Sequence, residues 1–195
     1  DGRRRQFPRF YFTSEADLLD ILSNGSQPAK IMIHVSKIYL STKTFELDEK
    51  SGVRPSAMKW ISGVGKEECK FEPAVLLEGK VEIYLQTVLD AFKKTMFNHT
   101  TRSLDRYQTM DRLEWVMHGG KSPSDMAQVI LLVAAIYYAD DLEQKVFPGL
   151  GKGDKGAMSN YNKEQMAELS KLIATTRTDL TGNQRKRVMC MITLD

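Results

Sequence analysis

The sequence predicts a mainly α-helical protein, a helical bundle or rod segment with a small antiparallel β element around residues 43–72. Over most of the chain, apolar residues recur in steps of three and four, which is the period of an amphipathic helix. Alternation typical of strands is confined to residues 43–72, where short runs flank Gly63 and Gly65. Because strands do not alternate with helices along the chain, the pattern favours a bundle over an α/β sheet.

The N-terminal part, residues 1–78, is expected to hold two helices and the β element. Residues 7–12 are aromatic and are expected to be extended. The Thr-Ser pair at residues 13–14 suits the cap of a helix that runs to about Ser23. That helix is expected to place three leucines on one face, namely Leu18, Leu19 and Leu22. Pro28 suits the first turn of a second helix, which reaches about Leu40 and carries Ile31, Val35 and Ile38 at helical spacing.

The C-terminal part, residues 79–195, is expected to be a helical bundle. Its first apolar stripe consists of Val81, Leu85, Val88, Leu89, Phe92 and Met96, and a second helix covers about 104–117. Pro123 and Ser124 are expected to open a helix over 126–146, and Pro148 is expected to stop it. Residues 129–135 are apolar on all sides, so this helix is expected to be the most buried one. Two further helices follow, one marked by Met166, Leu169, Leu172 and Ile173 and the other covering 185–194.

Length and charge set broad limits on function. At 195 residues the chain suffices for one domain or two small ones. A net charge of +3 is too small to indicate nucleic-acid binding, and no apolar run reaches the roughly 18 residues of a membrane span. The first residues lack an initiator Met and the apolar core of a signal peptide, so we expect a segment of a larger protein. Cys69 and Cys190 are far apart in sequence, and we expect them to be reduced, buried and intracellular.

The stretch GLGKGDKG, residues 149–156, contains the letters of the dinucleotide fingerprint G-x-G-x-x-G. That fingerprint must follow a strand and open a helix, because the pyrophosphate binds at the helix N-terminus. Here the expected helix precedes the stretch, and Ala157 follows Gly156 where a Walker A loop requires Lys. A nucleotide-binding enzyme is therefore disfavoured, and we expect an exposed, mobile connection.

No catalytic or metal-binding constellation is visible in the sequence. The histidines, His34, His99 and His118, fall on three different elements and have no partner at metal-ligand spacing. The adjacent pairs Glu67–Glu68 and Asp140–Asp141 point to different sides of their elements and so form no acid/base dyad. Tyr137 and Tyr138 are expected to point to different sides of their helix, so that one could face a neighbouring domain. The residues alone predict a non-catalytic helical module without cofactor or metal.

Several blocks of the sequence resemble the dynein heavy chain family. Residues 7–12, FPRFYF, and 17–22, DLLDIL, resemble the pattern F-P-R-F-[YF]-F and the helix after it, just before the motor ring. Residues 79–85, GKVEIYL, resemble G-x-V-E-x-W-L, with Tyr84 in place of Trp. The residues that carry these motifs are Phe7, Pro8, Arg9, Phe10, Tyr11, Phe12, Leu18, Leu19, Ile21, Leu22, Gly79, Val81, Glu82 and Leu85. The likeness departs at residues 52–56 and 152–157, and DLLDILSNG is most similar to axonemal outer-arm chains.

This resemblance implies a single linker segment over residues 1–195, the C-terminal part of the dynein linker before the first AAA+ module. The family's linker swings as ATP is bound and hydrolysed, so the segment would be a non-catalytic lever end without cofactor. ATP and Mg²⁺ would belong to the parent ring. The implied partners are the AAA+ ring of the same chain and, for the parent, microtubules and dynein light and intermediate chains. The implied location is cytoplasmic and cytoskeletal, in the axoneme of a cilium or flagellum, with no nucleic acid or membrane partner.

The final helix is expected to continue into the ring, and its basic residues Arg185, Lys186 and Arg187 are candidate ring-docking residues that would meet an acidic surface. A stand-alone helical adaptor or protein-interaction domain is the alternative with the same fold. The nucleotide-binding enzyme remains a third hypothesis, which predicts a higher melting temperature with Mg-ATP or a dinucleotide. Nucleic-acid binding is a weaker fourth, because no RNP, zinc or basic-stripe pattern accompanies the charge.

Overall fold

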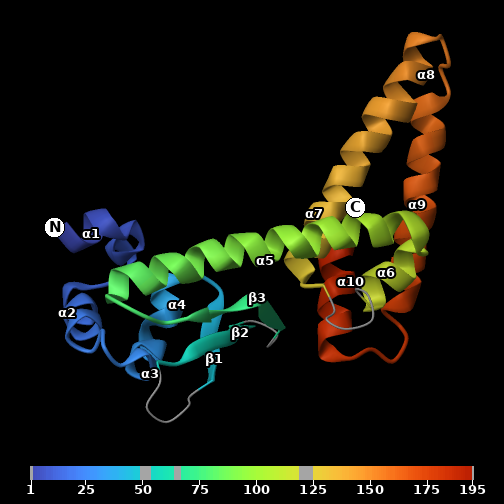
Figure 1. Ribbon diagram of the computed structural model, residues 1–195. Coiled ribbons are helices and arrows are strands. Elements are labelled where there is room, and N and C mark those ends of the chain that lie inside the picture. Colours follow the sequence, from blue (N-terminus) through green and yellow to red (C-terminus); the bar gives the residue numbers. More distant parts are fainter. Residues whose placement is uncertain (1, 49–53, 64–66, 119–124, 195) are drawn as a thin grey trace. The chain divides into compact units, whose positions relative to one another are not determined.

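The computed structural model describes residues 2–48, 54–63, 67–118 and 125–194 of the chain. It is mainly helical and contains one three-stranded antiparallel sheet, as the sequence predicts. Its contacts divide the chain into two compact units, Asp1–Phe97 and Asn98–Asp195. These units differ from the sub-parts 1–78 and 79–195 expected from the sequence, because the first half of the long helix α5 (Val81–Thr109) packs on the sheet (Figure 1).

The N-terminal unit begins with a series of short helices. They are α1 (Gly2–Gln6), the 3-10 helix η1 (Pro8–Phe12), α2 (Glu15–Ser23), α3 (Pro28–Ile31), the 3-10 helix η2 (Met32–His34) and α4 (Val35–Ile38). The expectation that residues 7–12 are extended is wrong. Pro8 stands in the first turn of η1, where its fixed φ suits a helix, and the amide of Phe10 donates to the oxygen of Phe7 at 3.1 Å. This turn lets Phe7 and Phe10 both reach the core.

The leucines of α2 do not share one face. Ile21 is fully buried, Leu18 and Leu22 are half-buried, and Leu19 is 60% exposed. Consecutive helical residues are about 100° apart around the axis, so Leu19 points away when Leu18 points inward. The cap is confirmed at Ser14, whose hydroxyl oxygen accepts a hydrogen bond from the amide of Asp17 at 3.1 Å. The second predicted helix is also confirmed, as the α3–η2–α4 series, with Ile31, Val35 and Ile38 fully buried.

The sheet consists of β1 (Thr42–Asp48), β2 (Ser56–Ser62) and β3 (Glu68–Leu76), paired in the order β1-β2-β3. The predicted β element around residues 43–72 is thus confirmed as a meander. Phe45 lies opposite Trp60, which lies opposite Cys69. Four aromatic rings form the core between the sheet and α5, with neighbouring centroids 4.7 to 5.8 Å apart: Phe45, Trp60, Phe71 and Phe92.

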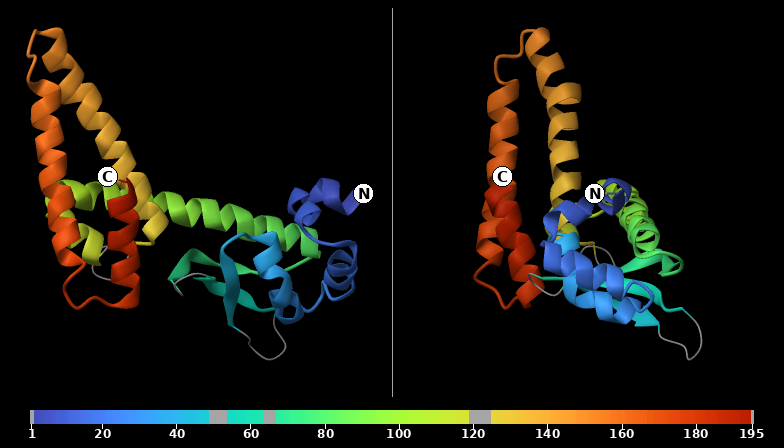
Figure 2. Two further views of the ribbon diagram at one scale, coloured as in Figure 1. Left: turned by 180° about the vertical axis from the view of Figure 1, so that it is seen from behind. Right: turned by 90° about the vertical axis from the view of Figure 1, so that its left-hand side faces the viewer.

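The C-terminal unit contains the end of α5 and the helices α6 (Arg112–His118), α7 (Ala127–Asp141), α8 (Phe147–Gly151), α9 (Ala157–Thr175) and α10 (Gly182–Leu194). Figure 2 shows α9 returning alongside the α7–α8 run in the opposite direction, and α10 packs against α6, α7 and α9. The helix expected over 104–117 is divided in two. The carboxylate of Asp111 accepts hydrogen bonds from the amides of Leu113 and Glu114 at 2.9 and 3.2 Å, which caps a new helix.

Pro148 does not stop the helix that precedes it. Between α7 and α8 the chain forms a π-helical turn, η3 (Leu142–Val146), and the amide of Phe147 donates to the oxygen of Leu142, five residues earlier. A proline lacks an N–H and its ring collides with the carbonyl four residues back in a regular α-helix. The wider turn just before Pro148 changes that spacing, so the helical path continues to Gly151.

Helix α7, which is expected to be the most buried helix because its sequence is apolar on all sides, is buried on one side only. Val129, Ile130, Val133 and Ala134 form the buried side. Leu132, Ile136 and Tyr138 are 49%, 40% and 53% exposed. Pro123 and Ser124, which were expected to open this helix, lie outside the described residues. No helix among those described is long and apolar enough to cross a membrane.

Candidate functional site

The motif FPRFYF divides into an inward and an outward set of side chains. Phe7 and Phe10 are fully buried in edge-to-face contact, with ring centroids 5.0 Å apart. The guanidinium of Arg9 donates to the oxygen of Ile38 at 3.1 Å, which attaches η1 to the end of α4. Tyr11 and Phe12 are 62% and 72% exposed. The first set therefore builds the fold, and the second is available for contacts.

The second motif block, GKVEIYL, packs against the end of α2. Glu82 is only 4% exposed and forms an ion pair with Arg3 of α1. The hydroxyl of Tyr84 donates to the oxygen of Gly25 at 3.2 Å. A Cβ placed on Gly25 would lie 3.1 Å from the Cβ of Val81, so a side chain at this glycine would crowd α5. The two motif blocks, far apart in sequence, thus form one packed structure, in which Leu85 is 1% exposed.

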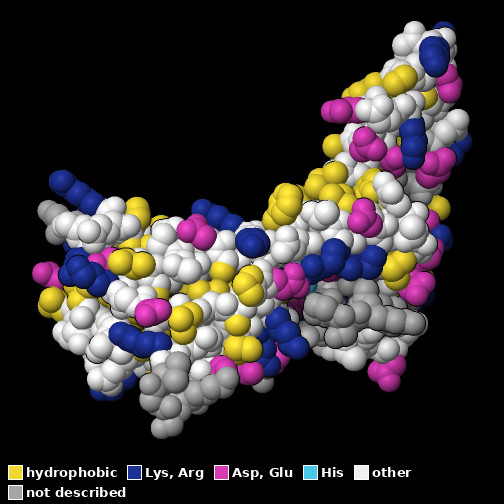
Figure 3. All heavy atoms as spheres, in the orientation of Figure 1, with side chains coloured by type: hydrophobic (Ala, Val, Ile, Leu, Met, Phe, Trp, Pro, Cys, Tyr) yellow, Lys and Arg dark blue, Asp and Glu magenta, His cyan; other side chains and the backbone are white. Residues whose placement is uncertain are grey.

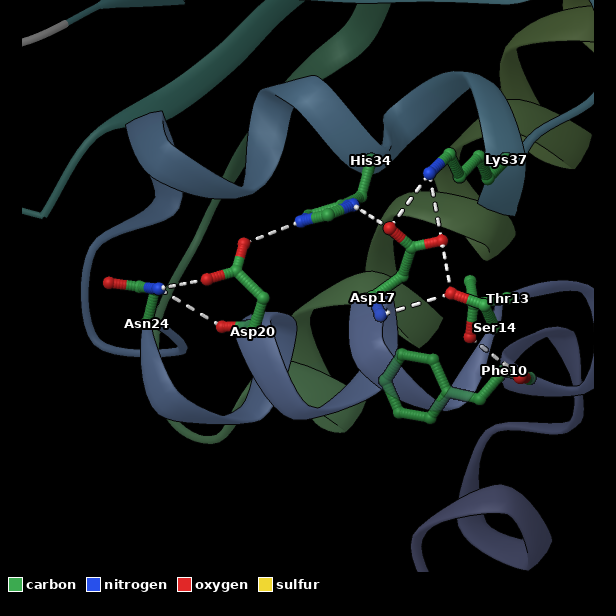
Figure 4. A network of polar contacts seen from close by, with 8 residues as sticks. All are labelled: Phe10, Thr13, Ser14, Asp17, Asp20, Asn24, His34 and Lys37. Atoms are coloured by element: carbon green, nitrogen blue, oxygen red, sulfur yellow. Dashed lines mark hydrogen bonds and ion pairs between the residues drawn. The ribbon is translucent and has the colours of Figure 1, made fainter.

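A polar network joins α2 to the η2–α4 segment (Figure 4). The imidazole of His34 is 5% exposed and lies between two carboxylates. Its Nε2 is 2.7 Å from Oδ2 of Asp20, and its Nδ1 is 3.5 Å from Oδ1 of Asp17. Asn24 donates to the Asp20 carboxylate at 2.9 Å. His34 is therefore held by a hydrogen bond to Asp20 and by a longer contact with Asp17, both from α2. Across the described residues, no group of three or more His, Cys, Asp or Glu side chains is placed to hold a metal ion.

Asp17 is the centre of this network. The ammonium of Lys37 donates to both oxygens of its carboxylate, at 2.7 and 2.8 Å. The hydroxyl of Ser14 donates to the same carboxylate at 2.7 Å. The hydrogen bond from Lys37, followed by that from Ser14, lowers the pKa of Asp17. The carboxylate is thus stabilised in its charged form, where it ties α4 to the N-terminus of α2.

The C-terminal unit contains a buried ion cluster around Asp125, whose side chain is 1% exposed. His99 places Nδ1 3.6 Å from one carboxylate oxygen, and Arg106 pairs with the other. Burial alone would raise the pKa of Asp125, but hydrogen bonds from His99, Arg106 and Ser103 outweigh it and lower the pKa. The cluster fixes the start of α7 to α5. It is a structural arrangement that the sequence patterns did not predict.

The candidate ring-docking residues lie in the first half of α10. Arg185 and Lys186 are exposed, whereas Arg187 is 6% exposed. The guanidinium of Arg185 donates to the oxygen of Thr176 at 3.1 Å. Residues 182–194 contain no acidic side chain. Cations near a helix N-terminus oppose the macrodipole, so these charges do not stabilise α10 itself.

A capping box fixes where α10 begins. The hydroxyl oxygen of Thr181 accepts from the amide of Gln184 at 3.3 Å. The side-chain oxygen of Gln184 accepts in return from the amide of Thr181 at 3.0 Å. This reciprocal pair satisfies two amides that the helix leaves without partners, and it positions Arg185 and Lys186 one turn into the helix.

The glycine-rich stretch lies at the junction of α8 and α9. Gly149 to Gly151 belong to α8, and residues 151–155 are exposed. Gly153 has a φ of +91°, and the carboxylate of Asp154 accepts from the amide of Gly156 at 2.8 Å. The preceding element is a helix, as expected, so the strand–turn–helix geometry of a dinucleotide fingerprint is not met.

Other sequence predictions have mixed outcomes. Cys69 is buried as expected, but Cys190 is exposed, because it lies on the side of α10 opposite the buried Met191 and Val188. Tyr137 and Tyr138 do point to different sides. Tyr137 stacks on Tyr107 with centroids 4.3 Å apart, and Tyr138 is 53% exposed. The side chain of His118 lies outside the described residues.

The structure also contains a pocket that the sequence analysis missed. It has a volume of about 360 Å³ and lies within the C-terminal unit, where α6, α7, α9 and α10 meet the end of α5. Tyr161 of α9 is 8% exposed and lines this pocket. The available signal was an aromatic residue within the otherwise polar run 159–165. Hydrophobic periodicity could not show that Tyr161 is buried, because the residues around it form no apolar stripe.

Comparisons with known proteins identify one family. Residues 1–103 match the family model described as dynein heavy chain, N-terminal region 2. The chain is 40% identical to a dynein alpha chain of the flagellar outer arm from Chlamydomonas reinhardtii and 32% identical to dynein axonemal heavy chain 9 from Homo sapiens. It is 31% identical to a ciliary dynein beta chain from Tripneustes gratilla. All of this chain is covered in each case, but it spans only 4% of the length of these relatives.

Proposed function

Because this chain belongs to the dynein heavy chain family, in its N-terminal region 2, we propose that it is the part of the linker that anchors the lever to the AAA+ ring. In this role the segment is non-catalytic. It passes on movement that the ring generates when it binds and hydrolyses ATP. The whole of residues 1–195 acts as one linker segment, with its C-terminal end against the first AAA+ module.

The observation that carries this proposal is the exposed basic pair Arg185 and Lys186 on α10. The pair is exposed, the helix contains no acidic side chain, and its dipole gains nothing from these cations. The unfavourable interaction of these two cations with the helix dipole is offset if they meet an acidic surface on a partner. Opposite charges across such an interface steer and orient docking. Arg187 is buried, so we assign the docking role to Arg185 and Lys186 and leave Arg187 to the packing of α10.

The proposal extends to the parent heavy chain. ATP and Mg²⁺ are bound by the parent ring, and the parent acts on microtubules with dynein light and intermediate chains. The relatives are named as axonemal, ciliary and flagellar outer-arm dyneins, which supports a place in the axoneme of a cilium or flagellum.

The test is charge reversal in the parent heavy chain with Arg185→Glu and Lys186→Glu together. Microtubule gliding velocity and basal ATP hydrolysis are measured on the same preparation. We expect the velocity to fall several-fold while basal hydrolysis persists, because the ring keeps its own catalytic groups and loses its hold on the lever.

The matched control reverses two other exposed lysines of the same unit, Lys152→Glu and Lys155→Glu. It changes the net charge equally but leaves α10 intact. Equal gliding velocities for the two double variants would contradict the docking role.

A further inference from the structure

The pocket in the C-terminal unit lies where α10 reaches its last described residue. Leu194 belongs to the wall of this pocket, whose volume is about 360 Å³. The rest of the wall comes from α5, α6, α7 and α9, so the packing of the unit forms the pocket. Its volume is at the lower end of the roughly 300–1,000 Å³ typical of ligand pockets, which suits a short piece of polypeptide.

Tyr161 of α9 gives this pocket a hydrogen-bonding group without a partner. The residue is 8% exposed, and among the described residues its buried hydroxyl has no hydrogen-bond partner. Burial, and after it the charge of Asp141, raises the pKa of Tyr161 to about 12. The hydroxyl therefore keeps its proton at neutral pH and can donate. Native proteins satisfy almost all buried polar groups, so we expect an acceptor that is supplied from outside the described residues.

The charges in the pocket wall favour an uncharged acceptor. Within the described part of the chain, the charged side chains of the wall are Arg112 and Asp141. Asp141 pairs with the ammonium of Lys145, and Arg112 has an interaction of its own. Asp141 also acts on Tyr161 more strongly than Arg112 does, so an anion beside this hydroxyl would be opposed. A main-chain oxygen, which every residue carries, accepts the hydrogen bond without adding a charge.

Apolar side chains of the pocket wall are only partly covered. Met158, Leu194 and Tyr138 line the pocket and are 44%, 48% and 53% exposed. Figure 3 shows hydrophobic side chains gathered over α7, the helix that carries Tyr138. Removal of such surface from water is favourable. A polypeptide segment can cover these side chains with its own apolar groups and present a main-chain oxygen to Tyr161 at the same time.

The segment that directly follows residue 195 is better placed for this pocket than a separate molecule. In the linker role proposed above, the chain continues past residue 195 toward the first AAA+ module, and Leu194 already stands in the pocket wall. A group on a short tether has an effective concentration in the millimolar range at a neighbouring site. A free molecule or a second polypeptide has no such advantage, because it loses its translational and rotational freedom on binding.

We propose that the segment directly after residue 195 fills this pocket, and that one of its main-chain oxygens accepts the hydrogen bond from the hydroxyl of Tyr161. The contact attaches the outgoing chain to α9, so that the chain is held to the unit at two points and not by α10 alone. The inference rests on the proposed linker role, because that role places the ring-bound chain after residue 195. It does not depend on the charges of Arg185 and Lys186.

The first experiment places the photo-crosslinker p-benzoylphenylalanine at position 158 of the parent heavy chain. Irradiation is followed by digestion and mass spectrometry. We expect the main cross-link to join position 158 to the segment within roughly ten residues after 195, the length of about three helical turns. Position 166 is the matched control, because Met166 lies on the same helix, is 53% exposed and does not line the pocket.

Three results of this experiment would overturn the proposal. The first is a main cross-link from position 158 to a distant part of the heavy chain or to another polypeptide. The second is a set of cross-links that remain within residues 98–195, which would mean that the pocket holds only solvent. The third is the same cross-link, in equal yield, from position 166.

The second experiment tests the hydrogen bond itself. Tyr161→Phe removes the donor hydroxyl and keeps the ring, and amide hydrogen exchange is measured over the segment after residue 195 in the parent heavy chain. We expect exchange there to accelerate about fivefold, the factor that corresponds to the loss of one hydrogen bond. Tyr138→Phe is the control, because it removes an exposed hydroxyl from the same pocket wall. Unchanged exchange in Tyr161→Phe, or equal acceleration in Tyr138→Phe, would overturn the proposal.

These measurements separate this inference from the ring-docking proposal. Normal gliding by the Arg185→Glu, Lys186→Glu variant would contradict docking by those charges and would leave the cross-link and the exchange rates unaffected. If gliding falls in that variant but position 158 gives no cross-link to the segment after 195, the inference about the pocket alone is overturned.

Discussion

The hydroxyl of Tyr39 donates a hydrogen bond of 2.6 Å to the main-chain oxygen of Leu85. Tyr39 is 3% exposed, and its ring lies 6.5 Å from that of Phe7 and 5.3 Å from that of Phe92. It therefore joins the N-terminal aromatic motif to α5 by packing and by a directed bond. The two sequence blocks that identify the family meet at this tyrosine.

Replacement of Tyr39 by Phe should lower the free energy of unfolding of the N-terminal unit by about 1 kcal/mol, the usual net contribution of a hydrogen bond. The ring stays, so packing is preserved. Urea unfolding can be followed by the fluorescence of Trp60 in a Trp115→Phe background, because each unit contains one tryptophan. Tyr11→Phe is the control, since Tyr11 is 62% exposed. An equal decrease in the free energy of unfolding in Tyr39→Phe and Tyr11→Phe would show that the hydrogen bond to Leu85 contributes nothing to stability.

Asp17 should make the stability of the N-terminal unit depend on pH. Its pKa in the folded protein is lowered from 3.8, mainly by the hydrogen bond from Lys37. A carboxyl with a lowered folded pKa contributes stability above its unfolded pKa and loses it as pH falls through the folded pKa. We expect Asp17→Asn to be less stable than the wild type at neutral pH.

This difference should shrink as pH falls below 3.8, because the Asp17 carboxylate of the unfolded chain becomes protonated there and that of the folded protein follows at a lower pH. Urea midpoints measured with Trp60 over this range provide the test. Glu15→Gln removes a charge from the same helical turn without touching Lys37 and serves as the control. A pH-independent difference between Asp17→Asn and the wild type would contradict the role of the Lys37 bond.

The parts of the fold that the sequence predicted are those set by local patterns. Ile31, Val35 and Ile38 recur at helical spacing, and all three are fully buried. The alternation around Phe45 and Trp60 predicted strands that pair face to face. Periodicity identifies a buried side whenever polar residues mark the opposite side, and these segments contain both kinds.

The features that the sequence did not predict depend on distant neighbours. Helix α7 is apolar on every side, so its composition contained no information about which side would be covered. Arg187 lies beside two exposed basic residues in sequence, yet the helical rotation carries it inward. The hydroxyl of Tyr161 belongs to a pocket made from several helices. The π-helical turn before Pro148 required knowledge of the backbone hydrogen bonds.

Asp125 should be among the most sensitive positions of the C-terminal unit. Asp125→Asn keeps the shape but removes the charge that pairs with Arg106 and faces His99. Breaking a buried ion pair costs about 3–5 kcal/mol, and we expect roughly 2–3 kcal/mol because solvent still reaches Arg106, which is 27% exposed. Trp115 fluorescence in a Trp60→Phe background reports on this unit. Asp105→Asn, an exposed carboxylate on α5, is the control, and a similar loss there would contradict the prediction.

The capping box of α10 should determine how rigidly the first turn of this helix, which carries the docking residue Arg185, is held. Thr181→Ala removes the hydroxyl that accepts from the amide of Gln184, which should cost about 1 kcal/mol. The stability is lost locally, in the first turn of α10. Amide hydrogen exchange should therefore accelerate at residues 183–185 and remain unchanged near Met191. Thr178→Ala is the matched control, because the Thr178 hydroxyl donates to the oxygen of Thr175 and lies outside the capping box.

If ring docking depends on a fixed α10, Thr181→Ala should also slow microtubule gliding while leaving the charges of Arg185 and Lys186 in place. Faster amide exchange together with normal gliding would show that docking does not depend on the stability of the first turn of α10. The charges of Arg185 and Lys186 would then dock without a preformed first turn.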